Sequence, residues 1–86
     1  MVTRRRRYRW AQIAALAREN EGRYVLHPDL AHITLDTLHH MRRRVPALRS
    51  TDTHEYGFAR GHEARDDLGV VRFDCYIRLA PKGSHP

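Results

Sequence analysis

Apolar and polar residues alternate along the chain from Val71 to Leu79, and no helix can gather residues of that period on one face. An extended strand places alternate residues on opposite sides, so this segment is expected to have one buried face and one wet face. The inward face comprises Val71, Phe73, Cys75, Ile77 and Leu79. The alternation therefore predicts an amphipathic strand.

A less regular strand precedes this one. Tyr56 and Phe58 give it an inward face, and Gly57 and Gly61 mark bulges or close backbone approaches. Between the two strands, residues 65–69 read Arg-Asp-Asp-Leu-Gly, a composition typical of turns. The simplest arrangement is an antiparallel hairpin.

The first half of the chain follows a helical period instead. A helix is predicted from Trp10 to about Asn20, and Gly22 suits the left-handed position after its end. Residues 23–26 have strand composition, and Pro28 ends that short strand. The apolar stripe of the helix comprises Trp10, Ile13, Ala14 and Ala17.

Residues 28–44 are helical in pattern, but Leu35 falls off a single stripe. A break at Ile33–Thr34 resolves the misfit. It yields a short helix over 28–32 and a second helix over 35–44, which Thr34 caps and Pro46 ends. In the second helix Leu35, Leu38 and Met41 are expected to face inward, while the outward residues are Asp36, Thr37, His40, Arg43 and Arg44, with His39 on a flank.

The charge is strongly asymmetric. The 86 residues carry a formal charge of +6, and residues 1–50 hold eleven Arg against four acidic residues. This length predicts one domain, divided here into a flexible basic arm (1–8), an α+β domain (9–80) and a disordered tail (81–86). The positive half favours an anionic partner.

Several protein classes are excluded. The single cysteine cannot form an internal disulfide, and no apolar stretch is long enough for a secretory signal or a membrane span, so we expect a cytoplasmic protein. An inward Cys75 predicts an inert thiol. His32, Asp36 and His40 would share one helix face only without the break at Thr34, so neither a metal nor another cofactor is expected. No nucleotide-binding or catalytic fingerprint occurs, which predicts a non-enzymatic protein.

The order helix, short strand, short helix, helix, hairpin is that of a winged helix-turn-helix domain. In that architecture the last helix lies in the major groove of DNA and the hairpin, or wing, contacts the backbone or the minor groove. The fold expected is therefore a small winged-helix-like α+β domain.

Short motifs along residues 8–80 carry a resemblance. They are Trp10 with Ile13-Ala14, the segment 21–26, Arg42-Arg43-Arg44 before Pro46, and the closing 76–79. In these the chain resembles small uncharacterised proteins of actinobacterial phages, and in size and element order it is similar to phage excisionases. The resemblance implies a phage-encoded protein in a bacterial host cell.

Together these features predict binding of duplex DNA, alone or as a homodimer, to regulate transcription or recombination. The expected contacts come from the arm, the second helix and the hairpin: Arg4, Arg5, Arg6, Arg7, Arg9, Thr34, Thr37, His39, His40, Arg43, Arg44, Arg49, Arg60 and Arg65. Asp36 opposes this interpretation, because phosphates repel a carboxylate. The alternatives are an effector that binds a host protein, through its basic half or through strand addition at the hairpin edge, and an RNA-binding protein.

Overall fold

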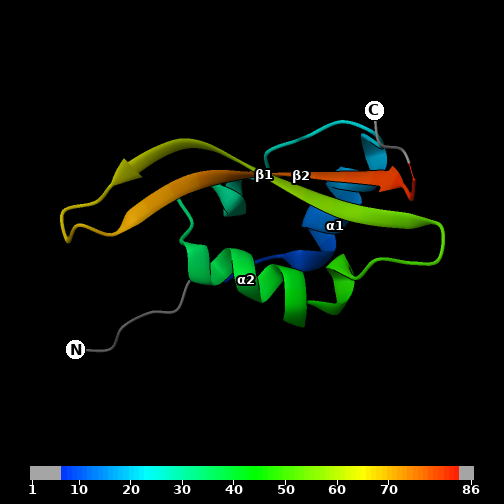
Figure 1. The fold of residues 1–86 in the computed structure, drawn as a ribbon, viewed down its shortest axis with the longest axis horizontal. Helices are drawn as coiled ribbons and strands as arrows, with labels where there is room; N and C mark the ends of the chain where they lie inside the picture. Colours follow the sequence, from blue (N-terminus) through cyan, green and yellow to red (C-terminus); the bar gives the residue numbers. More distant parts are fainter. Residues whose placement is uncertain (1–6, 84–86) are drawn as a thin grey trace.

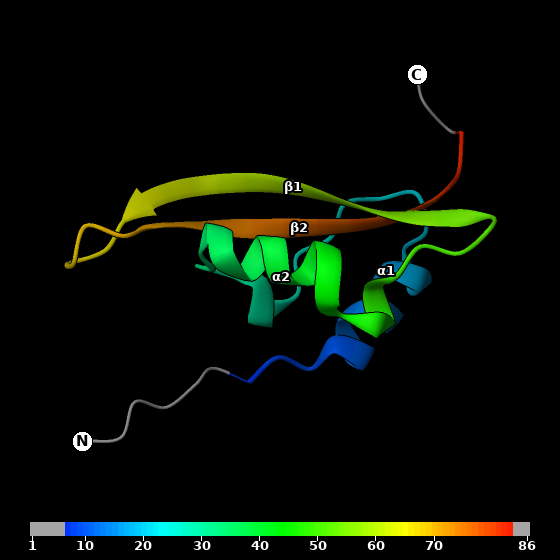
Figure 2. The same cartoon turned by 60° about the horizontal axis from the view of Figure 1, so that its bottom comes forward.

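The computed structural model describes residues 7–83. A long antiparallel hairpin forms one layer, and the helices cover one of its faces (Figures 1 and 2). In chain order the elements are α1 (Trp10–Glu19), the short 3-10 helix η1 (Pro28–Leu30), α2 (Leu35–Arg44), a second 3-10 helix η2 (Pro46–Leu48), β1 (His54–Arg65) and β2 (Val71–Pro81). The protein is thus a small α+β domain with its hairpin at the C-terminal end, and η2 is an element that the sequence did not predict.

The hairpin pairs in the register that the period of two predicts, with Phe58 opposite Ile77. The register shifts between Gly61 and Ala64. A Cβ atom on Gly61 would lie 3.1 Å from the ring of Tyr76, so the bulge and the close approach expected at this glycine are both present.

Asp66 holds the turn of the hairpin. One carboxylate oxygen accepts the backbone N–H groups of Leu68 and Val70 at 2.9 and 3.0 Å, and the other accepts Arg72 Nε at 2.9 Å. These bonds lower the pKa of Asp66 from its ordinary value, and the bond from Arg72 has the largest effect. Gly69 has a φ of 79°, the left-handed conformation that suits a glycine in a turn.

The other edge of β2 bonds to the segment between the two helices. Val25 and Ile77 exchange both backbone hydrogen bonds, at 2.9 and 2.8 Å, and Ile33 and Phe73 exchange theirs at 2.9 and 3.0 Å. The strand expected over residues 23–26 is therefore only an isolated bridge, because His27, the next residue that could bond to β2, is the N-cap of η1 and its C=O accepts the N–H of Leu30 at 2.9 Å.

The apolar stripes meet between the two layers. Along β2 the predicted inward face is confirmed except at Val71, which is half-buried. Trp10 is also only half-buried, so it borders the core of α1 instead of filling it. The buried cluster consists of Ile13, Ala14, Ala17, Leu30, Ile33, Leu38, Met41, Val45, Leu48, Phe73, Cys75, Ile77 and Leu79.

The break before α2 is confirmed. The short helix covers Pro28–Leu30, not 28–32, and His32 has a φ of 55°, which no helix accommodates. Thr34 occupies the N-cap position, although its hydroxyl makes no capping hydrogen bond.

The prediction for Leu35 is wrong. Its side chain is 47% exposed, whereas Leu38 and Met41 are buried. Val45, one residue past α2, is buried as well and centres the inward stripe on these three residues. Leu35 lies roughly 90° from that centre, on the flank that faces β1.

The C-terminal boundary lies beyond the predicted one. Pro81 closes β2, and the N–H of Lys82 donates to Thr53 O at 2.8 Å, so both belong to the folded domain. Within residues 7–83, no helix has the length and apolar character needed to cross a membrane.

Candidate nucleic-acid interface

Arg9 fixes the point where the N-terminal segment joins the domain. Its backbone N–H and its Nε donate to Asp29 Oδ2 at 2.9 and 3.1 Å, and its Nη2 donates to Oδ1 at 2.9 Å. This guanidinium lowers the pKa of Asp29 to about 2. Arg9 thus serves the fold, and Arg7 beside it is exposed. The predicted contacts Arg4, Arg5 and Arg6 lie outside the described residues.

Aromatic rings connect this junction to α2. Tyr8 and Trp10 stack with their ring centroids 4.8 Å apart, and the ring of His40 lies 6.2 Å from Trp10. Residues 7–9 consequently pass along the side of α2 that faces away from the hairpin (Figure 2). Tyr8, the end of the expected arm, therefore lies near the expected recognition helix.

The outward face of α2 is largely as predicted. His39, His40, Arg43 and Arg44 are exposed, and so is Asp36 near the start of the helix. The basic side chains lie in the last turn of α2, where they also suit the negative end of the helix dipole.

Thr34 and Thr37 are less available than predicted. Both are half-buried, and their hydroxyl oxygens lie 3.4 Å apart, within hydrogen-bond reach of each other. A base edge would have to replace that mutual contact. We therefore assign the outward face to the histidines and arginines.

Sequence reasoning missed Arg42. Its guanidinium lies over the ring of Phe58 at 5.9 Å from the ring centre, and it lines two adjoining cavities of about 460 and 650 Å³ between α2 and β1. Three consecutive arginines span most of a helix turn, so one of them had to point along the flank. The run of three arginines in the sequence could therefore have indicated a side chain at this position.

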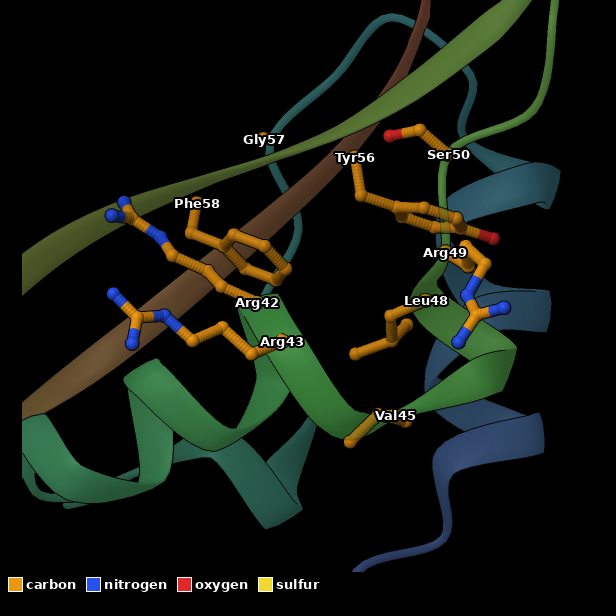
Figure 3. Close-up of a pocket in the computed structure, with 9 residues that line it drawn as sticks. All are labelled: Arg42, Arg43, Val45, Leu48, Arg49, Ser50, Tyr56, Gly57 and Phe58. Atoms are coloured by element: carbon orange, nitrogen blue, oxygen red, sulfur yellow. The ribbon is translucent and has the colours of Figure 1, made fainter.

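We call these two cavities together the β1–α2 groove. In Figure 3, Arg42 and Arg43 extend beside Phe58, and Arg49 lies on the Tyr56 side. The lining residues are Leu35, Leu38, His39, Arg42, Arg43, Val45, Leu48, Arg49, Ser50, Tyr56, Gly57, Phe58 and Arg60. None of these is acidic.

Four guanidiniums at the C-terminal end of α2 and in the segment after it have no counter-ion among residues 7–83. Arg42, Arg43, Arg44 and Arg49 are all exposed, and none forms a salt bridge with a carboxylate among residues 7–83. Like charges on one surface repel one another, so an anionic ligand bound there would reduce that repulsion.

The arginines of the hairpin differ from these. Arg60 lies 5.1 Å from the ring centre of Phe73 and 3.8 Å from a carboxylate oxygen of Glu63. Arg65, at the turn, donates to Gly69 O at 2.9 Å. The structure places Arg60 beside the β1–α2 groove and leaves Arg65 apart, at the turn.

The described residues contain no group of three His, Cys, Asp or Glu side chains close enough to hold a metal ion. Burial raises the pKa of the Cys75 thiol to about 11, which keeps it protonated at neutral pH. Comparisons with protein-family models, curated proteins and solved structures found no match.

Proposed function

We propose that this protein binds duplex DNA without catalysing a reaction, in the manner of a winged helix, and acts by occupying sites that regulate transcription or recombination. The supporting observation is the set of four exposed arginines, Arg42, Arg43, Arg44 and Arg49, with no carboxylate partner in residues 7–83. Guanidiniums that are not neutralised internally are available to phosphates.

The outward face of α2 supplies the two kinds of contact that such a protein needs. Arg43 and Arg44 bind phosphates beside the major groove, and His39 and His40 reach base edges. The Tyr8–Trp10 stack lies beside His40 on the same face. In this proposal the arginines that precede Tyr8 in the sequence follow the DNA backbone or enter the minor groove.

The hairpin serves as the wing. Its turn lies at the same end as the start of α2, since a cavity of about 280 Å³ there is lined by Thr34, Leu35, Asp36, Val70 and Val71. With α2 in the major groove, the turn reaches the neighbouring backbone, where Arg65 makes a single phosphate contact.

Fluorescence anisotropy with a labelled random duplex, across a salt series, tests the proposal. In Arg43→Glu/Arg44→Glu, duplex affinity is expected to fall at least about tenfold, and the log–log salt slope by about 2, since each phosphate contact contributes about 0.9. A matched control with the same charge change is Arg23→Glu/Lys82→Glu, at exposed positions outside α2.

The control should retain most of the wild-type affinity, because neither position lies on α2 or lines the β1–α2 groove. Equal losses in both variants would reduce the effect to net charge and remove α2 from the interface. Binding of an RNA hairpin in preference to duplex DNA at the same salt would assign the surface to RNA instead.

A further inference from the structure

The two edges of the hairpin differ in backbone hydrogen bonding. Ile77 directs both its N–H and its C=O to Val25, and Phe73 directs both to Ile33. In an antiparallel ladder successive residues bond alternately to the two sides. From Phe73 to Ile77, the odd-numbered residues of β2 therefore direct their backbone N–H and C=O groups away from β1. The even-numbered residues between them direct theirs toward β1.

This alternation fixes the orientation of β1. Gly57, Ala59 and Gly61 lie opposite Arg78, Tyr76 and Asp74, and so these glycines and the alanine make the bonds within the hairpin. Tyr56, Phe58 and Arg60 consequently direct their N–H and C=O groups away from β2. Within residues 7–83 no backbone partner meets them there.

The side chains of these same three residues line the β1–α2 groove. The groove therefore runs directly beneath an open strand edge. A strand added along this edge would point every second side chain into the groove and the others over the small residues Gly57 and Ala59.

The charge of the side chains that line the groove indicates which class of ligand it binds. The groove contains four arginines, Arg42, Arg43, Arg49 and Arg60, and no acidic side chain. A second copy of this chain, paired edge to edge, would bring two such sets together, and the chain carries a formal charge of +6. An acidic segment of another protein meets both the charge and the free hydrogen-bonding groups.

We propose that the free edge of β1 binds an extended acidic peptide of a partner protein as a third strand of the sheet, with carboxylates at alternate positions in the β1–α2 groove. Tyr56, Phe58 and Arg60 supply the backbone hydrogen bonds. Arg42 and Arg49 form ion pairs with the carboxylates of the peptide. The groove shares Arg42, Arg43 and Arg49 with the surface proposed to bind DNA, but the free edge of β1 takes no part in the proposed DNA contact.

Amide hydrogen exchange on the whole protein, with and without a blocked peptide of alternating Glu and Val, tests the geometry. In the free protein the amides of Tyr56, Phe58 and Arg60 are expected to exchange faster than those of Gly57 and Ala59. The peptide should slow exchange at the first three. Protection of these three amides before the peptide is added would contradict the free edge.

Two substitutions at Arg60 distinguish the contribution of its backbone N–H from that of its guanidinium charge. Arg60→Ala removes the guanidinium and keeps the N–H, whereas Arg60→Pro removes both; an edge strand tolerates proline where its N–H points outward. Peptide affinity is expected to be about tenfold lower for the proline variant than for the alanine variant, provided circular dichroism shows both folded. Equal affinities would overturn strand addition.

Two further probes test the partner class. An alternating Lys and Val peptide should not bind, and binding equal to that of the Glu peptide would remove the charge argument. Oligodeoxythymidine that slows exchange at Tyr56, Phe58 and Arg60, where the Glu peptide does not, would assign the groove to single-stranded nucleic acid. These amide readings are independent of the duplex titration, so either proposal can fail alone.

Discussion

The junction at Arg9 and the last turn of α2 both carry exposed guanidiniums, and the fold treats them in opposite ways. At the junction Asp29 accepts three hydrogen bonds from Arg9, and its pKa falls to about 2. At the end of α2, Arg43 and Arg44 have no carboxylate partner within residues 7–83. A count of basic residues does not separate these regions, but their pairing does.

The largest effect on stability is expected at the paired region. Asp29→Ala removes the acceptor of all three Arg9 bonds and also frees the backbone N–H of Arg9, so the free energy of unfolding should fall by about 2 kcal/mol. Chemical denaturation measures this change. An unchanged midpoint would mean that the Arg9 pair is as ineffective as an ordinary surface pair.

The same carboxylate gives the stability a pH dependence. Its pKa is about 2 in the folded protein against an ordinary 3.8, so its contribution is complete above about pH 5 and is lost as the pH falls through 3.8 toward 2. Denaturation series in this pH range should show that the free energy of unfolding declines less steeply with falling pH for Asp29→Asn than for wild type. Parallel declines would place the acid-sensitive group elsewhere.

A smaller loss of stability is expected at the hairpin turn. Asp66→Ala frees the N–H groups of Leu68 and Val70 and the guanidinium of Arg72, yet the site is exposed and water replaces these bonds. The midpoint temperature of thermal unfolding should fall less than it does for Asp29→Ala. Amide exchange should accelerate at Leu68 and Val70 while β2 remains protected at Ile77.

The smallest effect is expected at the unpaired region. Arg43→Ala/Arg44→Ala should change the free energy of unfolding by less than about 0.5 kcal/mol, since both side chains are exposed and form no ion pair within residues 7–83. A clear loss of stability would show that these arginines hold the fold. A gain would indicate that their mutual repulsion opposes folding.

Local patterns predicted most of the fold. The period of two located β2, the apolar stripe located α1, and the combination of Thr34 with Leu35 located the start of α2. Leu35 was misassigned because the inward direction of α2 is fixed by Val45, a residue past the helix end, together with packing against β2. The sequence shows the spacing of apolar residues but not where the neighbouring layer lies.

The candidate site was less predictable. Asp29 lies twenty residues from Arg9, so no local pattern reveals that this arginine is already engaged. The open edge of β1 follows from the bonds of Val25 with Ile77, a pairing between distant segments. The role of Arg42 beside Phe58 depends on the same tertiary arrangement.

The buried thiol gives this chain an internal reporter. Cys75 lies at the centre of β2, the strand that bonds on both sides, and it is the chain's single cysteine. A thiol reagent can reach it only when the hairpin and the segment beneath it separate. The rate of its modification therefore measures how often the core around Cys75 opens, without any label being introduced.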